Sequence, residues 1–364
     1  MSRFTNKRLN RLTPYSPGEQ KPGEDVIKLN TNESPFPPAR SVIAAIKDET
    51  IASLRLYSDA NSTRLKAGLS RYFKIAPERI FIANGSDEVL NFAFMAFCET
   101  AIAFPDITYG FYPVFCTLHG LDAKIIPVRD DLTIDSTDYL DIGMPIVIAN
   151  PNAPTGLSLS AAEIEMILAA NSSQVVIIDE AYIDFGGETA LNLLDKYDNL
   201  LVVRTYSKSR SLAGARLGFA IGSEELIDAL EKIKYSTNPY NVNTLTQKLG
   251  LASIEADDYY QKKVASIIKT RDETSRELRS QGLSVLNSKA NFLFVRSDAI
   301  GGEDLYLSLR ERGILVRHFA QERIYDYVRI TIGTPEEMNK LVCEIKNIIE
   351  GKQCRKTLLK KDRV

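Results

Sequence analysis

The sequence predicts an α/β protein with two domains. Short apolar runs alternate with helical stretches up to about residue 249, which is typical of a mostly parallel sheet between two layers of helices. Residues 247–279 are then long, polar and helical in character, and we expect them to lead into a smaller α+β domain. A chain of 364 residues is long enough for both domains.

Four apolar runs are predicted to be buried strands of the larger sheet: residues 79–82, 146–149, 175–178 and 200–203. Polar residues follow each of these runs directly. Open α/β sheets bind their ligands beyond the carboxyl ends of the strands. Because all four runs end in this way, we expect the residues that follow them to serve one ligand.

Two helix starts can be recognised. Gly85 and Ser86 fall where an apolar helical stretch begins, so free amides and the positive end of the helix dipole are available to an anion. The alternative is a capped helix with nothing bound. Ser160 and Glu163 form a capping box that opens a second helix.

The predicted domain boundaries follow from these patterns. Residues 1–28, rich in proline and glycine, are expected to form an arm that packs with the small domain. The large domain is placed at residues 29–249 and the small domain at residues 250–351. Residues 352–364 form a basic tail, which we expect to be solvated and frayed.

Composition argues against several classes of protein. The net charge of −2 argues against a nucleic-acid partner. No run approaches membrane-spanning length, and the N-terminus lacks the apolar core of a signal peptide. Two histidines and four scattered cysteines predict no metal site, and unpaired cysteines suit a reducing cytoplasm. The cysteines are Cys98, Cys116, Cys343 and Cys354.

Lys208 follows the fourth predicted strand. A lysine held in a cleft near other cations can form a Schiff base with a carbonyl group. Ser207 and Arg216 add a hydroxyl and a guanidinium, which are suited to a phosphate. Pyridoxal 5′-phosphate (PLP) carries an aldehyde and a phosphate and requires this combination. The alternative is a surface lysine after a strand.

The ends of two other strands support this interpretation. Asp179 ends the third strand and could keep a pyridine nitrogen protonated, although an aspartate there is often a helix cap. Tyr182 follows within one helical turn and could reach the ring oxygen. Asn152 offers a side-chain donor toward the same oxygen, although its segment could simply be a rigid turn.

Arg329 and Arg317 are the candidates for binding an anionic substrate. Arg329 alternates with Val328, Ile330 and Ile332, so it should lie on the opposite face of a strand. Arg317 also ends an apolar run. An exposed arginine is the common case. Two arginines at the ends of adjacent strands could instead form one site for a carboxylate or a phosphate.

Taken together, these segments resemble fold-type I PLP-dependent enzymes of the class I and II aminotransferase group. Within that group the chain is most similar to the histidinol-phosphate aminotransferases. The matching segments span nearly the whole chain in order. They are residues 28–35, 84–88, 150–156, 179–182, 204–218, 238–243, 290–292, 313–317 and 328–333.

The resemblance implies a role for each matching residue. Tyr109 would stack on the cofactor ring, and Tyr57 would reach the cofactor phosphate of the neighbouring subunit of a homodimer. Catalysis is assigned to Lys208, Asp179 and Tyr182. Cofactor binding is assigned to Gly85, Ser86, Tyr109, Asn152, Asp179, Tyr182, Ser207, Lys208, Arg216 and Tyr57. Substrate binding is assigned to Tyr15, Asn32, Arg317 and Arg329.

The resemblance also implies a reaction, transamination of L-histidinol phosphate with 2-oxoglutarate in histidine biosynthesis, which yields glutamate. Three positions depart from the family pattern: Ile107 replaces a proline, and Ser34 and Ala153 each replace an asparagine. Three alternatives remain: an aromatic amino acid aminotransferase, a threonine-phosphate decarboxylase and a PLP-sensing regulator. The regulator would need a DNA-binding domain, for which the N-terminal arm is too short.

Overall fold

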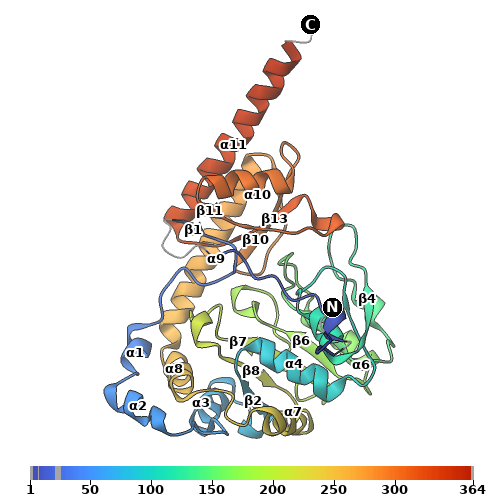
Figure 1. Cartoon of the computed structure of the whole chain (residues 1–364), viewed down its shortest axis with the longest axis vertical. Coiled ribbons are helices and arrows are strands. Elements are labelled where there is room, and N and C mark those ends of the chain that lie inside the picture. The colour runs from blue at the N-terminus through green and yellow to red at the C-terminus, as the bar shows by residue number, and fades with distance from the viewer. Residues whose placement is uncertain (1–2, 7, 21–25, 362–364) are drawn as a thin grey trace.

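The computed structural model describes residues 3–6, 8–20 and 26–361, and of residues 352–361 only the backbone. A large sheet with its helices fills the lower half of Figure 1, and a smaller domain fills the upper half. The helix α9 (Asp257–Ser280) runs from one to the other. This arrangement confirms the predicted α/β fold with a second, smaller domain.

The large sheet has seven strands in the order β2-β8-β7-β6-β5-β3-β4. Strands β3 to β7 are parallel, and β8 is antiparallel to both of its neighbours. Strand β2 therefore runs in the same direction as β7, so all four predicted strands end at one edge. The bounds are β2 Ile80–Ala83, β3 Ala101–Pro105, β4 Asp122–Ile126, β5 Ile146–Ala149, β6 Val176–Asp179, β7 Leu200–Thr205 and β8 Gly218–Ile221.

The inner strands are continuous apolar runs because both faces of the sheet are covered. In β5, Ile146 and Ile148 join one hydrophobic cluster while Val147 and Ala149 join another. Helices α3, α6 and α8 pack on the first cluster and α4, α5 and α7 on the second. Their bounds are α3 Thr63–Phe73, α4 Ser86–Phe97, α5 Tyr112–His119, α6 Ala161–Ala170, α7 Glu224–Thr237 and α8 Thr244–Glu255.

The predicted helix starts are confirmed. Helix α4 begins at Ser86, directly after Gly85. Helix α6 begins with the capping box, in which the Glu163 backbone amide donates to Ser160 Oγ and the Ser160 backbone amide donates to Glu163 Oε2. Two short helices, α1 (Arg40–Ala44) and α2 (Asp48–Ala52), precede α3.

The small domain contains an antiparallel sheet in the order β12-β13-β10-β9. Val328, Ile330 and Ile332 are fully buried in its core, as the alternating pattern predicts. The strands are β9 Leu283–Val285, β10 Phe292–Ser297, β12 Arg317–His318 and β13 Tyr327–Thr331. The helices α10 (Gly302–Glu311) and α11 (Pro335–Lys361) cover this sheet.

The N-terminal arm contacts both domains. Strand β1 (Ile27–Lys28) pairs in parallel with β11 (Ile314–Leu315) of the small domain, and Glu19 forms an ion pair with Arg310. Arg8 donates to the backbone oxygen of His119 in the large domain. The arm thus passes from the small domain across to the large one.

The structure differs from the sequence prediction in two helical regions. The stretch expected at residues 247–279 is divided at Ala256 into α8 and α9. Tyr260 packs in the core of the large sheet, and Val264 packs in the core of the small domain. Helix α9 therefore passes from one core to the other between these two residues. The boundary at residue 249 stays a prediction.

The second difference concerns the C-terminus. The backbone of residues 352–361 continues α11 instead of fraying, and this helix projects from the small domain in Figure 1. Lysine, arginine, glutamine and leucine in this stretch are good helix formers. Residues 362–364 lie outside the described part.

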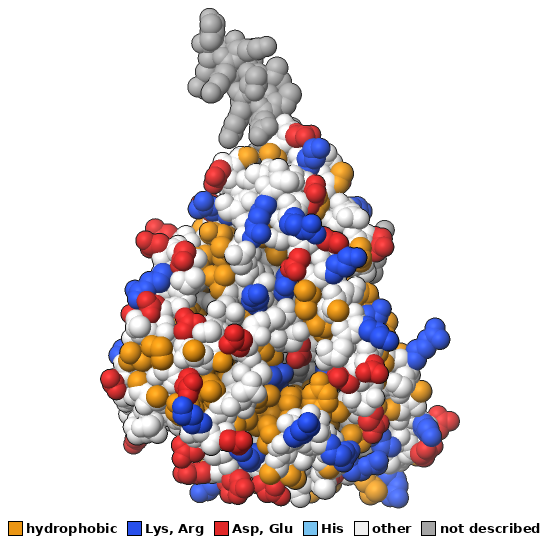
Figure 2. Space-filling model, turned by 180° about the vertical axis from the view of Figure 1, so that it is seen from behind, with side chains coloured by type: hydrophobic (Ala, Val, Ile, Leu, Met, Phe, Trp, Pro, Cys, Tyr) orange, Lys and Arg blue, Asp and Glu red, His pale blue; other side chains and the backbone are white. Residues whose placement is uncertain are grey.

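The surface seen from behind carries charged side chains of both signs, with hydrophobic patches mostly on the half that holds the large domain (Figure 2). Among the described residues, none of the helices combines the length and apolarity needed to cross a membrane.

Gly218 of β8 provides a test of the fold near the start of α4. A Cβ atom on this residue would lie 2.3 Å from the backbone nitrogen of Ser86 and 2.4 Å from the carbonyl carbon of Gly85. We predict that Gly218→Ala lowers the free energy of unfolding by about 1–3 kcal/mol, the usual cost of overpacking. Urea denaturation measures this difference.

Gly214→Ala is the matched control, because nothing lies within 4 Å of the Cβ that it introduces. Its stability should stay within about 0.5 kcal/mol of the wild type. Equal stabilities of the two variants would contradict the close contact between β8 and α4.

Candidate active site

A cavity of about 210 Å³ lies at the shared carboxyl edge of the large sheet, between the two domains and the arm. Eleven of the predicted site residues line it. They are Tyr15, Asn32, Ser86, Tyr109, Asp179, Tyr182, Ser207, Lys208, Arg216, Arg317 and Arg329. The sheet therefore brings together side chains that are as many as 314 positions apart in the chain.

Asp179 is buried at the end of the central strand β6. Its carboxylate accepts hydrogen bonds from the hydroxyl of Tyr112 at 3.1 Å and from the backbone amide of Ala181 at 3.2 Å. Burial raises the pKa of the Asp179 carboxyl to about 7, against the lowering effect of these two donors. The described residues form no ion pair with Asp179, so a cation in the cavity would find an uncompensated carboxylate.

Lys208 lies three residues beyond the end of β7. Its Nζ donates to the backbone oxygen of Thr31 at 3.3 Å and lies 5.7 Å from the centre of the Tyr182 ring. Both contacts are weak, so the amine can change partners. This is the property that a lysine nucleophile requires.

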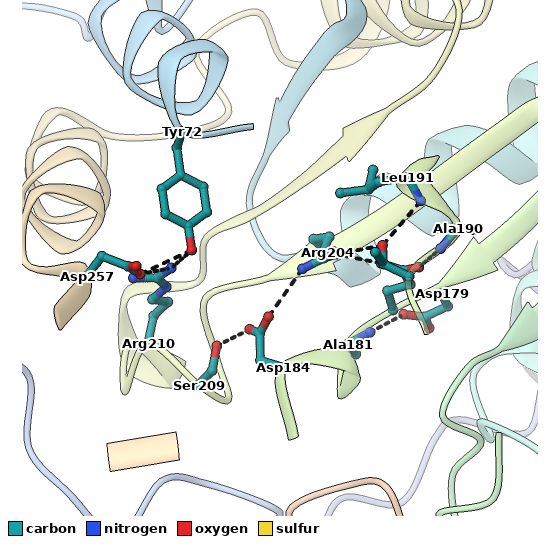
Figure 3. Close-up of polar contacts among 12 residues, drawn as sticks. Tyr72, Asp179, Ala181, Asp184, Ala190, Leu191, Arg204, Ser209, Arg210 and Asp257 are labelled. Atoms are coloured by element: carbon teal, nitrogen blue, oxygen red, sulfur yellow. Dashed lines mark hydrogen bonds and ion pairs between the residues drawn. The ribbon is translucent and has the colours of Figure 1, made fainter. Parts of the chain in front are cut away.

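Side-chain contacts hold the residues on both sides of Lys208, and Figure 3 shows the contacts of Arg204, Ser209 and Arg210. Before it, Arg204 forms ion pairs with Glu180 at 2.8 Å and with Asp184 at 3.2 Å. After it, the hydroxyl of Ser209 donates to Asp184.

Arg210, the next residue, forms an ion pair with Asp257 at 2.7 Å and donates to the hydroxyl of Tyr72 at 3.0 Å. Lys208 is therefore a loosely held side chain on a fixed loop.

The start of α4 and Arg216 bring together groups that are suited to an anion. Gly85 has φ +88°, and Arg216 lies over it, so that a Cβ atom on Gly85 would be 2.7 Å from Arg216 Nη2. Arg216 pairs with Asp87 at 2.9 Å, and the hydroxyl of Tyr109 donates to Asp87 at 2.8 Å. Helix amides, the hydroxyl of Ser86 and this guanidinium are suited to a phosphate.

Arg317 and Arg329 lie directly opposite each other in the β12–β13 pair. Like charges in this position destabilise a sheet unless a counter-charge is present. Arg329 donates to the backbone oxygen of Asn30 at 3.1 Å, and its Nε has no hydrogen-bond partner among the described residues.

Arg317 donates to the backbone oxygens of Ser16 and Pro17 in the arm. Burial lowers the pKa of Arg329 below its usual value, and the charge of Arg317 adds to this effect. Neither arginine forms an ion pair with a described carboxylate. The two side chains therefore leave positive charge available to an anion at the small-domain side of the cavity.

Asn32 connects the two sides of the site. Its Nδ2 donates to the hydroxyl of Tyr182 at 2.9 Å, and its Oδ1 accepts from Thr331 Oγ1 at 2.9 Å. Asn32 has φ +58°, a left-handed conformation that asparagine tolerates better than most residues. This fixes the Tyr182 hydroxyl relative to β13.

Three predicted residues do not line the cavity. Gly85 lies behind Arg216. Asn152 is buried, and its amide nitrogen donates to the backbone oxygen of Ile107 at 2.9 Å and to Thr155 Oγ1 at 3.3 Å. Tyr57 is 82% exposed on the surface, with its ring stacked on that of Tyr240.

Among the residues that sequence reasoning missed, Tyr112 and Asp87 contact predicted site residues through their side chains. Tyr112 is fully buried and donates to Asp179, while Asp87 bridges Arg216 and Tyr109. Asp87 occurs in one of the segments that match the family pattern, residues 84–88, whereas Tyr112 lies outside those segments. Each of these polar side chains lies at the start of an apolar helix, and this was the signal that could have singled it out. Sequence spacing alone does not reveal which residue each side chain contacts.

The chain matches the family described as aminotransferase class I and II over residues 24–345. It is 49% identical over 354 residues to the histidinol-phosphate aminotransferase of Brachyspira hyodysenteriae, covering 96% of this chain and 100% of that protein. It is 44% identical over 351 residues to that of Clostridium botulinum, covering 96% of this chain and 99% of that one.

Solved structures show the same fold. The histidinol-phosphate aminotransferase of Sinorhizobium meliloti in complex with pyridoxal-5′-phosphate has a TM-score of 0.86 at 24% identity, covering 96% of this chain and 98% of that chain. The histidinol-phosphate aminotransferase of Clostridium acetobutylicum has a TM-score of 0.83 at 25% identity, covering 90% and 100%.

Burial of Asp179 predicts a pH dependence of stability when no ligand is bound. Its carboxyl has a pKa of about 7 in the folded chain and an ordinary value of 3.8. Between these values the folded chain holds a proton that the unfolded chain lacks, so stability falls as the pH rises from 3.8 to 7. Each pKa unit corresponds to about 1.4 kcal/mol.

Asp179→Asn removes this contribution because the amide does not titrate. We expect urea denaturation to show that the wild type loses several kcal/mol relative to the variant between about pH 4 and pH 7. A stability difference that stays constant over this range would show that Asp179 is charged throughout.

Proposed function

This chain belongs to the aminotransferase class I and II family, and we propose that it transfers the amino group of L-histidinol phosphate to 2-oxoglutarate with PLP as cofactor. The observation that carries this conclusion is the full-length similarity to proteins named histidinol-phosphate aminotransferase, at 43–49% identity. The paired arginines of the cavity support it independently, because they suit an anionic substrate.

The described residues fit PLP at both of its charged ends. Asp179 is a buried carboxylate that a protonated pyridine nitrogen would compensate. At the other end, the absence of a Cβ atom on Gly85 lets Arg216 lie over the start of α4. Ser86 and Ser207 line the same cavity and add hydroxyl groups for the phosphate. Bound PLP supplies an electron sink for charge on the substrate carbon next to the amine.

The residues of this chain then have distinct tasks. Asp179 would keep the pyridine nitrogen of bound PLP protonated. Lys208 would hold the cofactor aldehyde, and its Nζ is the group of this chain that would take the proton from the amine-bearing carbon of the substrate. Tyr182 would donate to the ring oxygen, and Tyr109 would cover the ring. Asn152 Nδ2 donates to the backbone oxygen of Ile107 at 2.9 Å and to Thr155 Oγ1 at 3.3 Å, so its contact with the ring oxygen would require one of these bonds to open.

Arg329 and Arg317 bind the anionic end of each substrate. A planar guanidinium forms two parallel hydrogen bonds with a carboxylate or with a phosphate, so one pair serves both half-reactions. Tyr15 and Asn32 line the same cavity and limit its width. The phosphate of histidinol phosphate carries more charge than the carboxylate of glutamate, and two arginines match it better than one.

We further infer a cytoplasmic homodimer with shared active sites. Tyr57 lies outside its own cavity and is highly exposed, which suits a residue that serves another subunit. Ile43, Ile51, Leu54 and Leu56 on the same N-terminal stretch are also 45–59% exposed, and a partner subunit would cover them. The described cysteines are free thiols, which suits a reducing compartment.

The substrate is tested by comparing wild-type kcat/KM for histidinol phosphate, phenylalanine and threonine phosphate side by side, with 2-oxoglutarate as acceptor. We expect histidinol phosphate to exceed phenylalanine at least tenfold, about the value of one additional charge-assisted hydrogen bond. A clear preference for phenylalanine would refute the substrate while leaving the cofactor chemistry intact. Release of carbon dioxide from threonine phosphate would identify a lyase.

Shared active sites are tested by mixing two impaired chains. In a mixed dimer of Tyr57→Phe and Lys208→Ala chains, one active site contains both defects and the other contains neither. We therefore expect activity to reappear on mixing, up to one working site per mixed dimer. The control is each variant mixed with itself. An absence of recovery in verified mixed dimers would argue that each site is built from one chain.

A further inference from the structure

Lys234 is a buried lysine outside the active-site cavity. It lies in the last turn of α7 and is 2% exposed. Its Nζ donates to the backbone oxygen of Ala60 at 2.9 Å and forms an ion pair with Glu231, which also pairs with Lys66 at 2.6 Å. Burial lowers the pKa of Lys234. Since burying an ammonium is unfavourable, its contact with Ala60 requires an explanation.

Two neighbouring contacts hold the same short segment. The hydroxyl of Tyr235 donates to Asn61 Oδ1 at 2.6 Å, and Gln247 Nε2 of α8 donates to the backbone oxygen of Asp59 at 2.9 Å. Residues 59, 60 and 61 are thus each fixed by a side chain from α7 or α8. This segment also starts α3, because Asp59 accepts from the backbone amide of Thr63 at 2.7 Å.

Tyr57 lies two residues before this segment. Its ring stacks on that of Tyr240 with centroids 4.5 Å apart and an interplanar angle of 15°. Tyr240 follows α7 closely in the chain. None of the described residues forms a hydrogen bond with Tyr57. Its position therefore depends on the stacking contact and on the fixed backbone at residues 59–61.

We propose that Lys234 is a positioning residue that acts through the backbone of residues 59–61 on Tyr57, and so on the active site of the partner subunit. The inference rests on the shared active site proposed above. A leucine would fill the same space without a desolvation cost. Only a long side chain with a donor at its end can reach the oxygen of Ala60 from the core, which accounts for a lysine at this position.

The first measurement compares homodimers of Lys234→Met with wild type. Methionine keeps the length and the apolar packing but removes the donor. We expect the dissociation constant for PLP to rise and kcat/KM to fall by about tenfold each, the equivalent of one charge-assisted hydrogen bond. Lys232→Met is the matched control, because Lys232 is exposed on the same helix, and it should leave both values unchanged.

The second measurement separates action on the partner from action within the chain. In a mixed dimer of Lys234→Met and Lys208→Ala chains, the site with a working lysine belongs to the Lys234→Met chain. Its Tyr57 comes from the other chain, whose Lys234 is intact. We expect this site to regain PLP affinity and kcat/KM to within about twofold of wild type, since distant effects add nearly independently.

Tyr235→Phe provides a milder variant, because Tyr235 is 50% exposed and loses only its hydroxyl. It should show a smaller loss with the same recovery on mixing, which keeps the test valid if Lys234→Met does not form dimers. The inference is overturned if both homodimers behave as wild type. It is also overturned if mixing restores Tyr57→Phe chains but not the Lys234 and Tyr235 variants.

This second outcome leaves the shared site and the transaminase reaction standing. If Tyr57→Phe chains also fail to recover activity on mixing with Lys208→Ala chains, the proposal of a shared active site is refuted, and this inference is refuted with it. A wild-type protein without transaminase activity would instead refute the proposed function, whereas PLP affinity in the mixed dimers would still report on Lys234.

Discussion

The burial of Asp179 without a cationic partner is the constraint on which the rest of the active site depends. Strand β6 lies between the parallel strands β5 and β7, and Asp179 at its end is only 4% exposed. Two neutral donors, Tyr112 and Ala181, are all that the described residues offer to its carboxylate. The packed cores on both faces of the sheet keep this unfavourable group in place. The cost of burying this carboxylate is met when the chain folds. A ligand with a protonated nitrogen therefore binds more tightly, because it provides the missing opposite charge.

Lys208 shows the complementary arrangement, in which the backbone is fixed and the side chain is not. Ser209 and Arg210 are held by Asp184 and Asp257, so the loop cannot follow the amine when it changes partners (Figure 3). In the proposed reaction, a rigid loop would preserve the geometry of the site while the lysine moves a proton. Arg204 and Arg210, which form the ion pairs of this network, do not line the cavity. Their contribution is to hold the loop that carries Lys208.

Local patterns were sufficient to predict the strands, the capping box of α6 and the common edge at which polar residues gather, because each depends on residues close together in the sequence. The strand patterns also predicted that Arg317 and Arg329 lie on adjacent strands, but their register, directly opposite each other, depends on the pairing of β12 with β13. The break at Ala256 and the inward amide of Asn152 depend on packing between distant segments. Tyr112 and Asp87 were missed for the same reason, since hydrogen bonding across 22 to 129 positions leaves no periodic signal.

The arginine pair links substrate recognition to the N-terminal arm. Two guanidinium groups facing each other across β12 and β13 repel, and the arm offsets this only in part through the backbone oxygens of Ser16, Pro17 and Asn30. Carbonyl dipoles do not neutralise two full charges, and Arg329 Nε has no hydrogen-bond partner among the described residues. The remaining positive potential favours an anion in the cavity. In the proposed function, a doubly charged phosphate would balance both arginines, whereas a single carboxylate would balance one, so the same pair would accept both substrates while favouring the phosphate.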